Sequence, residues 1–576
     1  MNTLKIHRKK IRICTISIIS MLILLACRLL YIMVFLSEEL SEKATMLHQR
    51  ERSIKAERGK IISSDGYVLA DNKTVCTVSV IHSQIENPEK VISVLSKELE
   101  VPADRVRKYV EKVSSMERIK SNVSKEIGDR IRNYNLPGVK VDEDSKRYYP
   151  YNELASKVLG FTGGDNQGIV GIESRYESVL KGINGQILTM TDATGKELEN
   201  EATDRIEPIP GNDLHVSIDY SIQSYVEQAA MKAYEAKDAK SVSVIVMNPQ
   251  NGEIYAMVNY PEYDLNRPYE LNYSVDRDLS EKEKMELLNS MWRNGITNDT
   301  YEPGSTFKTI TATAALSLGV VSEKDHFTCT GRTTVSNRTI KCHKTTGHGA
   351  QTFAETLMNS CNPAFINWGM RVGKENFLFY MKKLGLLSKT GIDLPGEATT
   401  IMHKTEDIKD LELATMSFGQ SFQITPLQLL RAVSCVINGG TLVTPHIGIK
   451  KVDADGNEDI FQYNTEKNVL SSSVCDTMKK LLRKVVAEGG GQKCNIEGYS
   501  IGGKTATSQK LPRSAQKYIS SFIGFAPAEN PQVLAMCIID EPQGVYYGGT
   551  IATPVIREIF ENILPYLGIE KSDGKG

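Results

Sequence analysis

Residues 241–258 read SVSVIVMNPQNGEIYAMV, and this stretch decides the architecture of most of the chain. Ser241–Met247 is almost continuously apolar and predicts a buried strand, while NPQNG at 248–252 is typical of a turn. Glu253–Val258 then returns as the second strand of a β-hairpin. A buried strand needs neighbours, so we expect the hairpin to belong to a larger sheet.

The segments around the hairpin indicate what that sheet contains. Tyr220–Lys237 has helical periodicity, residues 262–300 are polar and predict a loop, and Thr425-Pro426 begins a helix with an N-cap residue and a first-turn proline. Three alternating segments predict antiparallel strands, and a final helix follows them: Tyr499–Thr507, Ile519–Ala526, Val533–Ile539 and Pro554–Leu567. The expected fold class is α+β, with a mainly antiparallel five-stranded sheet flanked by helices.

The composition indicates an ordinary globular protein with several domains. The chain has 576 residues, of which 40% are hydrophobic and 24% charged, and this excludes collagen-like and largely disordered proteins. The net charge of −1 lacks the basic excess of nucleic-acid-binding proteins, so we expect no nucleic acid partner. Ten cysteines in this length do not make a disulfide scaffold.

An apolar segment near the N-terminus predicts a membrane anchor. Ile13–Leu36 contains one charge, Arg28, and as a helix it spans roughly 36 Å, enough for a bilayer core. Five basic residues precede it and place the N-terminus in the cytoplasm: Lys5, Arg8, Lys9, Lys10 and Arg12. A cleaved signal peptide and a lipoprotein box at Leu24–Cys27 are the alternatives, but a second apolar run follows Cys27 directly. We therefore expect a single-pass protein of the cell membrane with an extracytoplasmic main part.

The linear organisation follows from these segments and from a change in composition near Asn212. A charged, helix-like stretch, Ser37–Lys60, suggests a stalk, and short apolar segments with glycine and proline turns predict an α+β module before residue 211. The expected divisions are a cytoplasmic N-terminus, a membrane helix, a membrane-proximal pedestal domain, a large main domain and a tail: 1–12, 13–36, 37–211, 212–567 and 568–576.

The pattern Ser-x-x-Lys occurs twice, at Ser305–Lys308 and Ser514–Lys517, and alone it is close to chance. Ser305 follows Pro303-Gly304 and precedes an Ala- and Thr-rich run, so it should lie where a helix begins. Residues i and i+3 share a helix face, which brings the Lys308 amine near the Ser305 hydroxyl. The positive end of a helix disfavours a second positive charge, so Lys308 should be able to accept a proton from Ser305. A helix cap with a surface lysine is the plainer interpretation.

Two further sequence elements favour the catalytic interpretation of Ser305 and Lys308 over the helix cap. Ser360-Cys361-Asn362 is the only Ser-x-Asn in the chain, and it offers a hydroxyl and an amide from one tight turn. A Lys-Thr-Gly element would complete the set, and a literal one occurs at Lys389-Thr390-Gly391, but it leads into a proline-containing loop. Lys504-Thr505-Ala506-Thr507 instead ends a predicted strand, so we assign the third element to Lys504.

In this order and context, the chain resembles the class B penicillin-binding proteins, the monofunctional peptidoglycan D,D-transpeptidases, and most closely their division and sporulation type. The resemblance extends over nearly the whole length. It includes Tyr301–Lys308, Asn359–Pro363, Thr425–Gln428, Tyr546–Gly549 and the pedestal motifs around Arg58-Gly59, Arg147–Pro150 and Gly168–Glu173. The pedestal residues are expected to hold structure.

The resemblance implies acyl transfer on a D-Ala-D-Ala stem peptide, with β-lactams acylating the same serine. Ser305 would be the nucleophile and Lys308 its base, and Ser360 with Lys504 would pass a proton to the leaving D-Ala. The substrate would be held by Asn362, Thr505 and Thr507. It also implies no metal or organic cofactor, and as partners a membrane-embedded glycosyltransferase with division or sporulation proteins.

Ala506 stands where the family usually has glycine, so an altered rate or drug affinity is expected. Rival functions are a catalytically impaired scaffold that activates a glycosyltransferase, and a β-lactam sensor or hydrolase.

Cys329, Cys342, His343 and His348 have roughly zinc-like spacing, and Cys361 lies inside the Ser-x-Asn element. Three interpretations stay open for the thiols Cys329, Cys342 and Cys361. They are loop thiols without a role, a disulfide involving Cys342 that could act as a redox control if Cys361 is its partner, or, for Cys329 and Cys342 only, zinc ligands together with His343 and His348.

Overall fold

The computed structural model describes residues 2–40, 49–114, 116–190 and 204–571 and divides into two compact units. The small unit comprises Met1–Glu57, Lys73–Lys146 and Ile183–Ile209. The large unit comprises Arg58–Asn72, Arg147–Gly182 and Pro210–Gly576. The linear boundary near Asn212 stays a prediction, because it divides the chain by position whereas these units are defined by contacts.

The first helix, α1 (Asn2–Phe35), contains the one segment of the described chain with the length and composition to cross a membrane. That segment is His7–Phe35, its most apolar window has a mean hydropathy of 2.5, and none of that window is buried. An isolated apolar helix of this length is typical of a single membrane-spanning anchor.

In the small unit, amphipathic helices cover a set of strands. Val78, Leu95 and Val106 are buried in its core, and the Asn87 side chain caps α3. The elements are β1 (Gln49–Ile54), β3 (Val68–Val80), β4 (Glu117–Ser124), β5 (Val139–Tyr148), β6 (Gly185–Met190), β7 (Asp204–Ile206), α3 (Pro88–Leu99), α4 (Ala103–Val110) and α5 (Lys125–Asn133). The first five residues of β3, up to residue 72, belong to the large unit, and the rest of the strand belongs to the small unit.

The predicted helical stalk over Ser37–Lys60 is confirmed at residues 37–40, which are helical, and is wrong from residue 49 onward. Residues 41–48 lie outside the described residues, and Gln49–Ile54 form β1, which pairs antiparallel with β6. Pairing with a distant strand overrides the local helical preference of this charged stretch. The predicted tail, 568–576, is described as far as residue 571.

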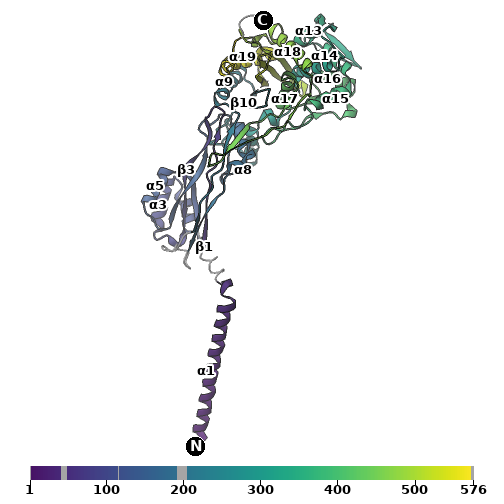
Figure 1. Cartoon of the computed structure of the whole chain (residues 1–576). Helices are drawn as coiled ribbons and strands as arrows, with labels where there is room; N and C mark the ends of the chain where they lie inside the picture. The colour runs from purple at the N-terminus through teal and green to yellow at the C-terminus, as the bar shows by residue number, and fades with distance from the viewer. Residues whose placement is uncertain (1, 41–48, 115, 191–203, 572–576) are drawn as a thin grey trace. The chain divides into compact units, whose positions relative to one another are not determined.

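The centre of the large unit is a five-stranded antiparallel sheet in the order β10-β9-β23-β22-β21. Figure 1 shows α9 and α19, which pack against each other and against this sheet. The elements are β9 (Ser241–Met247), β10 (Ile254–Tyr260), β21 (Gly502–Gln509), β22 (Tyr518–Ala526), β23 (Val533–Asp540), α9 (Tyr220–Lys237) and α19 (Gly548–Tyr566). The α+β class and the five-stranded sheet are therefore confirmed.

Both faces of this sheet are buried, which explains why its strands are so apolar. Along β9, Val242 and Val244 pack in the core that contains α9 and α19, whereas Ile245 and Met247 pack in the core on the opposite face. Because neighbouring side chains point to opposite faces, a strand covered on both sides becomes a continuous apolar run.

A mostly helical layer covers the second face. Its helices are α10 (Glu281–Trp292), α11 (Gly295–Asn298), α12 (Lys308–Ser317), α13 (Phe353–Met358), α14 (Asn362–Val372), α15 (Lys374–Lys383), α16 (Asp410–Met416), α17 (Pro426–Ile437) and α18 (Ser472–Ala487). Short strand pairs connect them: β11 (His326–Cys329) with β14 (Gly349–Thr352), β12 (Arg332–Val335) with β13 (Arg338–Lys341), β15 (Ile401–Met402) with β16 (Phe422–Gln423), and β17 (Leu442–Val443) with β20 (Thr465–Glu466).

A second sheet of the large unit joins segments far apart in sequence. β8 pairs antiparallel with β18 and parallel with β2, and β2 pairs antiparallel with the first residues of β3. Its elements and the helices beside them are β2 (Ile61–Ile62), β8 (Asp213–Val216), β18 (Gly448–Val452), β19 (Glu458–Ile460), α6 (Ser156–Leu159), α7 (Gly171–Arg175) and α8 (Glu177–Leu180).

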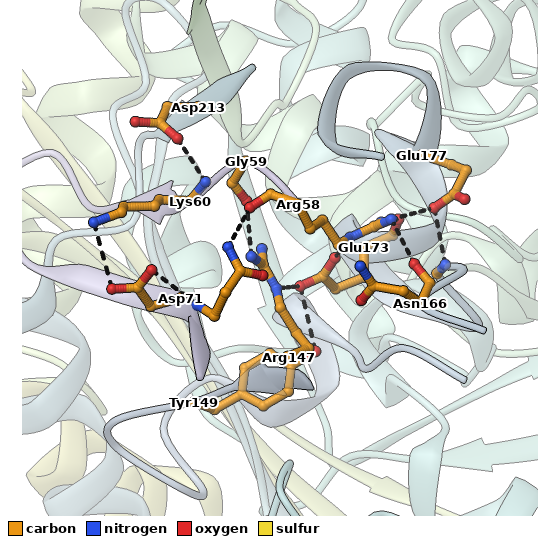
Figure 2. A network of polar contacts seen from close by, with 12 residues as sticks. Arg58, Gly59, Lys60, Asp71, Arg147, Tyr149, Asn166, Glu173, Glu177 and Asp213 are labelled. Carbon is orange, nitrogen blue, oxygen red and sulfur yellow. Dashed lines mark hydrogen bonds and ion pairs between the residues drawn. The ribbon is translucent and has the colours of Figure 1, made fainter. Parts of the chain in front are cut away.

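Beside this sheet lies a buried ion-pair network, shown in Figure 2. Glu173 is fully buried, and its two carboxylate oxygens each lie 2.6 Å from an arginine Nε, one of Arg58 and one of Arg147. Arg147 also donates to the backbone oxygen of Gly59 at 2.8 Å, and the Tyr149 hydroxyl donates to Glu173 at 3.3 Å. The network ties residues 58–72 to residues 147–182, which agrees with the structural role expected for these motifs.

Candidate active site

The turn that carries Ser305 is built by two glycines. Gly304 has a φ of +58°, and a Cβ there would lie 2.1 Å from Ser508 Oγ, so only glycine fits without displacement. The Gly304 N–H donates to the Gly419 oxygen at 2.8 Å. A 3-10 turn, Gly304–Phe307, then leads into α12, so Ser305 lies one turn before the helix that we expect it to begin.

Ser305 itself is half-buried, and its hydroxyl makes no hydrogen bond to any residue that the structure describes. Lys308, three positions later, is the first residue of α12 and is fully buried. The spacing i, i+3 places both side chains on one side of the turn. A serine oxygen that is accessible and otherwise unengaged is available to attack a bound electrophile.

The Lys308 amine lies among three oxygen acceptors. Its Nζ is 2.7 Å from the Ser360 backbone oxygen, 3.2 Å from Ser360 Oγ and 2.7 Å from Asn362 Oδ1. Burial lowers the pKa of Lys308 to about 7, because removing the amine from water disfavours its charged form. A substantial fraction of Lys308 is then neutral near neutral pH and able to accept a proton.

Ser360-Cys361-Asn362 forms the tight connection between α13 and α14. Ser360 has a φ of +50°, a left-handed conformation that is rare for residues other than glycine. Backbone hydrogen bonds fix it: Ser360 N–H donates to Leu357 at 3.1 Å, and Cys361 N–H donates to Thr356 at 3.0 Å. Strained backbone of this kind is often found at functional sites. Here it turns the Ser360 hydroxyl and the Asn362 amide toward the same lysine.

Lys504 approaches the same hydroxyl from the sheet. It is buried in β21, and its Nζ lies 3.0 Å from Ser360 Oγ and 3.0 Å from the Thr505 backbone oxygen. Burial, with the nearby Lys308 charge as a second cause, lowers the pKa of Lys504 well below its ordinary value. Lys308, Ser360 and Lys504 thus form one hydrogen-bonded chain that joins α12, the α13–α14 turn and β21.

β21 is the last strand in the order of the five-stranded sheet, so its outer edge has no strand partner among the described residues. Along it, Lys504, Ala506 and Ser508 are buried, while Thr505 and Thr507 alternate with them and are half-exposed. An unpaired strand edge can bind an extended peptide. Thr507 Oγ1 accepts a hydrogen bond from the Gly548 N–H at 3.0 Å, which leaves its hydroxyl hydrogen free to donate.

The position of Ala506 bears on the altered rate or drug affinity that the sequence leads us to expect. Ala506 is 4% exposed, and a Cβ added at Gly304 would lie 3.7 Å from the Ala506 methyl group. The methyl group therefore lies on the buried face of β21, facing the Gly304 turn. Thr505 and Thr507 alternate with it along the strand and lie on the other face.

The second Ser-x-x-Lys and the literal Lys-Thr-Gly of the sequence both lie outside this site. Ser514 and Lys517 of the second Ser-x-x-Lys are exposed, and Lys517 pairs with Glu541. Thr390 of the literal Lys-Thr-Gly lies in a loop, where its N–H donates to Glu397 at 2.6 Å. Lys504 is hydrogen-bonded to the Ser360 hydroxyl, as required of the third element.

Sequence reasoning missed the residues that position the Ser305 turn. Glu302 accepts from the Ser421 N–H at 2.8 Å and pairs with Arg513 at 2.8 Å, and Gly419 accepts from Gly304. Two positive-φ positions, Gly419 and Ser421, bend this supporting loop. Gly419 was the available signal in this segment, but a single glycine does not reveal which distant turn it contacts.

A cluster of possible metal ligands lies behind the Ser360 turn. The ligand atoms of Cys329, Cys342, His348 and Cys361 all lie within 4.8 Å of one another. His343, which the sequence spacing suggested, is not part of this set, and Cys361 takes its place. Cys329, Cys342 and Cys361 are free thiols in the structure, with no disulfide among them.

Taken together, the site can activate a serine, relay a proton and bind an extended acyl donor along a strand. A neutral lysine next to a serine hydroxyl is the usual requirement for nucleophilic catalysis without histidine. The Ser360 hydroxyl has two lone pairs and one hydrogen, so it can accept from a lysine and still pass a proton onward.

Comparisons with known proteins match the chain over most of its length. Residues 242–561 match the model described as "Penicillin binding protein transpeptidase domain", and residues 53–216 match the "Penicillin-binding Protein dimerisation domain". Stage V sporulation protein D of Bacillus subtilis is 38% identical over 94% of this chain and 83% of its own length. Peptidoglycan D,D-transpeptidase FtsI of Buchnera aphidicola subsp. Baizongia pistaciae is 30% identical over 96% of this chain and 94% of its own length.

Among solved structures, a peptidoglycan synthetase from Bifidobacterium adolescentis superposes with a TM-score of 0.73. It is 23% identical and covers 92% of this chain and 98% of its own. At that identity the likeness shows the fold alone, and it extends over both units.

Proposed function

Because this chain belongs to the class B penicillin-binding proteins, of the division and sporulation type, we propose that it is a serine D,D-transpeptidase that cross-links peptidoglycan stem peptides. The observation that carries this proposal is the hydrogen-bonded chain from Lys308, three residues after Ser305, through Ser360 to Lys504 on β21, whose outer edge has no strand partner among the residues that the structure describes.

In the first half-reaction, a stem peptide ending in D-Ala-D-Ala lies along β21. Ser305 Oγ attacks the penultimate D-Ala carbonyl, and the neutral Lys308 amine takes the serine proton. The new oxyanion is stabilised by the backbone N–H groups of Ser305 and Thr507. The Thr505 and Thr507 hydroxyls bind the terminal carboxylate, and Asn362 holds the acyl chain through its amide.

The peptide C–N bond then breaks and the terminal D-Ala leaves as an amine. The proton that this nitrogen needs comes through the Ser360 hydroxyl, which lies 3.2 Å from Lys308 and 3.0 Å from Lys504. In the second half-reaction, an amine of a neighbouring stem attacks the Ser305 ester and gives up a proton to the same chain. An amide cross-link forms and the serine hydroxyl is restored. A β-lactam would acylate Ser305 by the same first step, with its ring nitrogen as the leaving group.

The place of the reaction follows from α1. We assign the N-terminus to the cytoplasm, because the basic residues precede the apolar segment, and the rest of the chain to the outer side. The transpeptidase would then meet nascent peptidoglycan next to the membrane. A membrane-embedded glycosyltransferase and division or sporulation proteins are the partners that this arrangement suits.

The test is labelling of the full chain in detergent with a fluorescent penicillin. Labelling should occur in the wild type and be lost in Ser305→Ala. Ser514→Ala is the matched control, because Ser514 has the same Ser-x-x-Lys pattern but is exposed and lies outside the site. Loss in Ser514→Ala, or labelling that persists in Ser305→Ala, would contradict the assignment. Absence of labelling in folded wild type would favour the scaffold function, and rapid hydrolysis of the acyl-enzyme would favour a hydrolase.

A further inference from the structure

The cluster behind the Ser360 turn has the composition of a structural metal site. Cys329 ends β11, Cys342 follows β13, His348 precedes β14 and Cys361 is the N-cap residue of α14. Four donors therefore come from four separate places in the chain. Cys329 and Cys342 are each 2% exposed and Cys361 is 0% exposed, while His348 is partly exposed.

The spacing of the four donors suits a tetrahedral ion. Zinc bound at about 2.3 Å to sulfur and about 2.0 Å to nitrogen holds its ligand atoms about 3.5 to 3.8 Å apart. Cys342 Sγ lies 3.6 Å from His348 Nδ1, and all four ligand atoms are within 4.8 Å of one another. A disulfide would use two of the three sulfurs and leave a thiol and an imidazole beside it.

The surrounding backbone supports charged sulfur ligands. The Gly331 N–H donates to Cys329 Sγ at 3.4 Å, and N–H donors of this kind favour a thiolate. The positive end of α14 lies at Cys361 and favours negative charge there. Gly347 has a φ of +85°, and a Cβ there would lie 2.3 Å from the Cys329 oxygen, so the loop closes tightly before His348.

We propose that Cys329, Cys342, His348 and Cys361 bind one zinc ion, and that this ion holds the Ser360-Cys361-Asn362 turn in its working conformation. Three thiolates and one imidazole are a donor set that zinc prefers, and four protein ligands leave no open position for catalysis. The role is structural. Cys361 is bonded on both sides to residues that contact Lys308, so fixing its sulfur fixes Ser360 and Asn362 relative to that amine.

The metal half of this proposal is tested without any assay of activity. The full chain, purified in detergent without added metal, should contain about one zinc per chain by inductively coupled plasma mass spectrometry. Cys342→Ser and His348→Ala should each lower that content at least fivefold, and His348→Ala guards against misfolding because its side chain is partly exposed. Cys475→Ala is the matched control, a buried cysteine of α18 outside the cluster, and should keep the zinc.

Two further readouts separate zinc from its alternatives. Cobalt(II) in place of zinc should give a thiolate charge-transfer band and the intense visible bands of tetrahedral cobalt. Alkylation of the unreduced, chelated and denatured chain should modify all ten cysteines. A disulfide between two cluster cysteines, or wild type without metal and without tetrahedral cobalt bands, overturns the site.

The positioning half rests on the proposed function and is tested separately. Removal of zinc by a chelator should slow acylation of Ser305 by penicillin at least tenfold, and added zinc should restore the rate. Zinc that can be removed with no change in acylation would overturn the positioning role. A zinc-loaded chain that is never acylated would contradict the transpeptidase proposal, while the metal content would still support the site.

Discussion

The pH dependence of Ser305 acylation follows from the burial of Lys308. Burial lowers the pKa of this amine to about 7, and acylation requires its neutral form. Raising the pH removes the proton, so the rate should rise with pH and level off. For a pKa of about 7, the neutral fraction grows from about 9% at pH 6 to about 91% at pH 8, a tenfold increase in rate. An ordinary lysine would give a hundredfold increase over the same interval and no plateau.

The assay is the second-order rate constant of acylation by a fluorescent penicillin, measured at intervals from pH 5.5 to 9.5 at constant ionic strength. Lys504 shares the Ser360 hydroxyl with Lys308, so the midpoint belongs to the coupled pair. Lys517→Ala, in the exposed second Ser-x-x-Lys, should leave the profile unchanged, and Lys308→Arg should abolish the reaction. A rate that keeps rising with unit slope beyond pH 9 would refute the assignment of Lys308 as a lysine neutral near pH 7.

Three further changes test other parts of the structure. Glu173→Gln leaves two buried arginines without their carboxylate and should lower the free energy of unfolding by about 3 to 5 kcal/mol, measured by urea titration. Glu177→Gln, whose side chain is 30% exposed, should cost much less, and equal effects would argue against the network. Gly304→Ala would bring a methyl group to 2.1 Å from Ser508 Oγ and should slow penicillin acylation at least tenfold; an unchanged rate would show that the turn adapts. Ala506→Gly removes a methyl group that faces this turn and should leave acylation as fast or faster in the same assay, so slower acylation would contradict the view that this methyl group hinders the reaction.

The strands of the central sheet could be predicted because burial on both faces leaves a strong apolar signal. The predicted ranges of β9, β22 and β23 agree with the observed strands within one residue at each end, and β21 begins three residues later than expected. α19 begins six residues before its predicted start at Pro554. These differences lie at element ends, where local sequence is least informative.

The loop predicted over residues 262–300 is wrong, because it contains α10. Its start carries a full capping box, in which Ser280 and Glu283 bond each other's backbone N–H groups. Only three side chains of α10 are buried, Leu288, Met291 and Trp292, so the polar composition concealed a helix that lies mostly in solvent. The capping signal was present in the sequence and outweighs composition here.

The principal site residues could be proposed from order and context, but their supports could not. Lys504 was distinguishable from Lys389 because a strand precedes it and two strands follow. Nothing in the sequence connects Gly419 with Gly304, or Cys361 with Cys329, because these contacts are made only when distant segments fold together.

The ion-pair network around Glu173 restricts where the chain can be truncated. The chain enters the large unit at Arg58, leaves it after Asn72, returns for Arg147–Gly182 and returns again at Pro210. A fragment cut at residue 212 would therefore discard β2, both arginines and their carboxylate, and would leave Leu214 and His215 of β8 without the strand that pairs with them. A version meant to keep the large unit intact must therefore retain residues 58–72 and 147–182 together with residues 210–576.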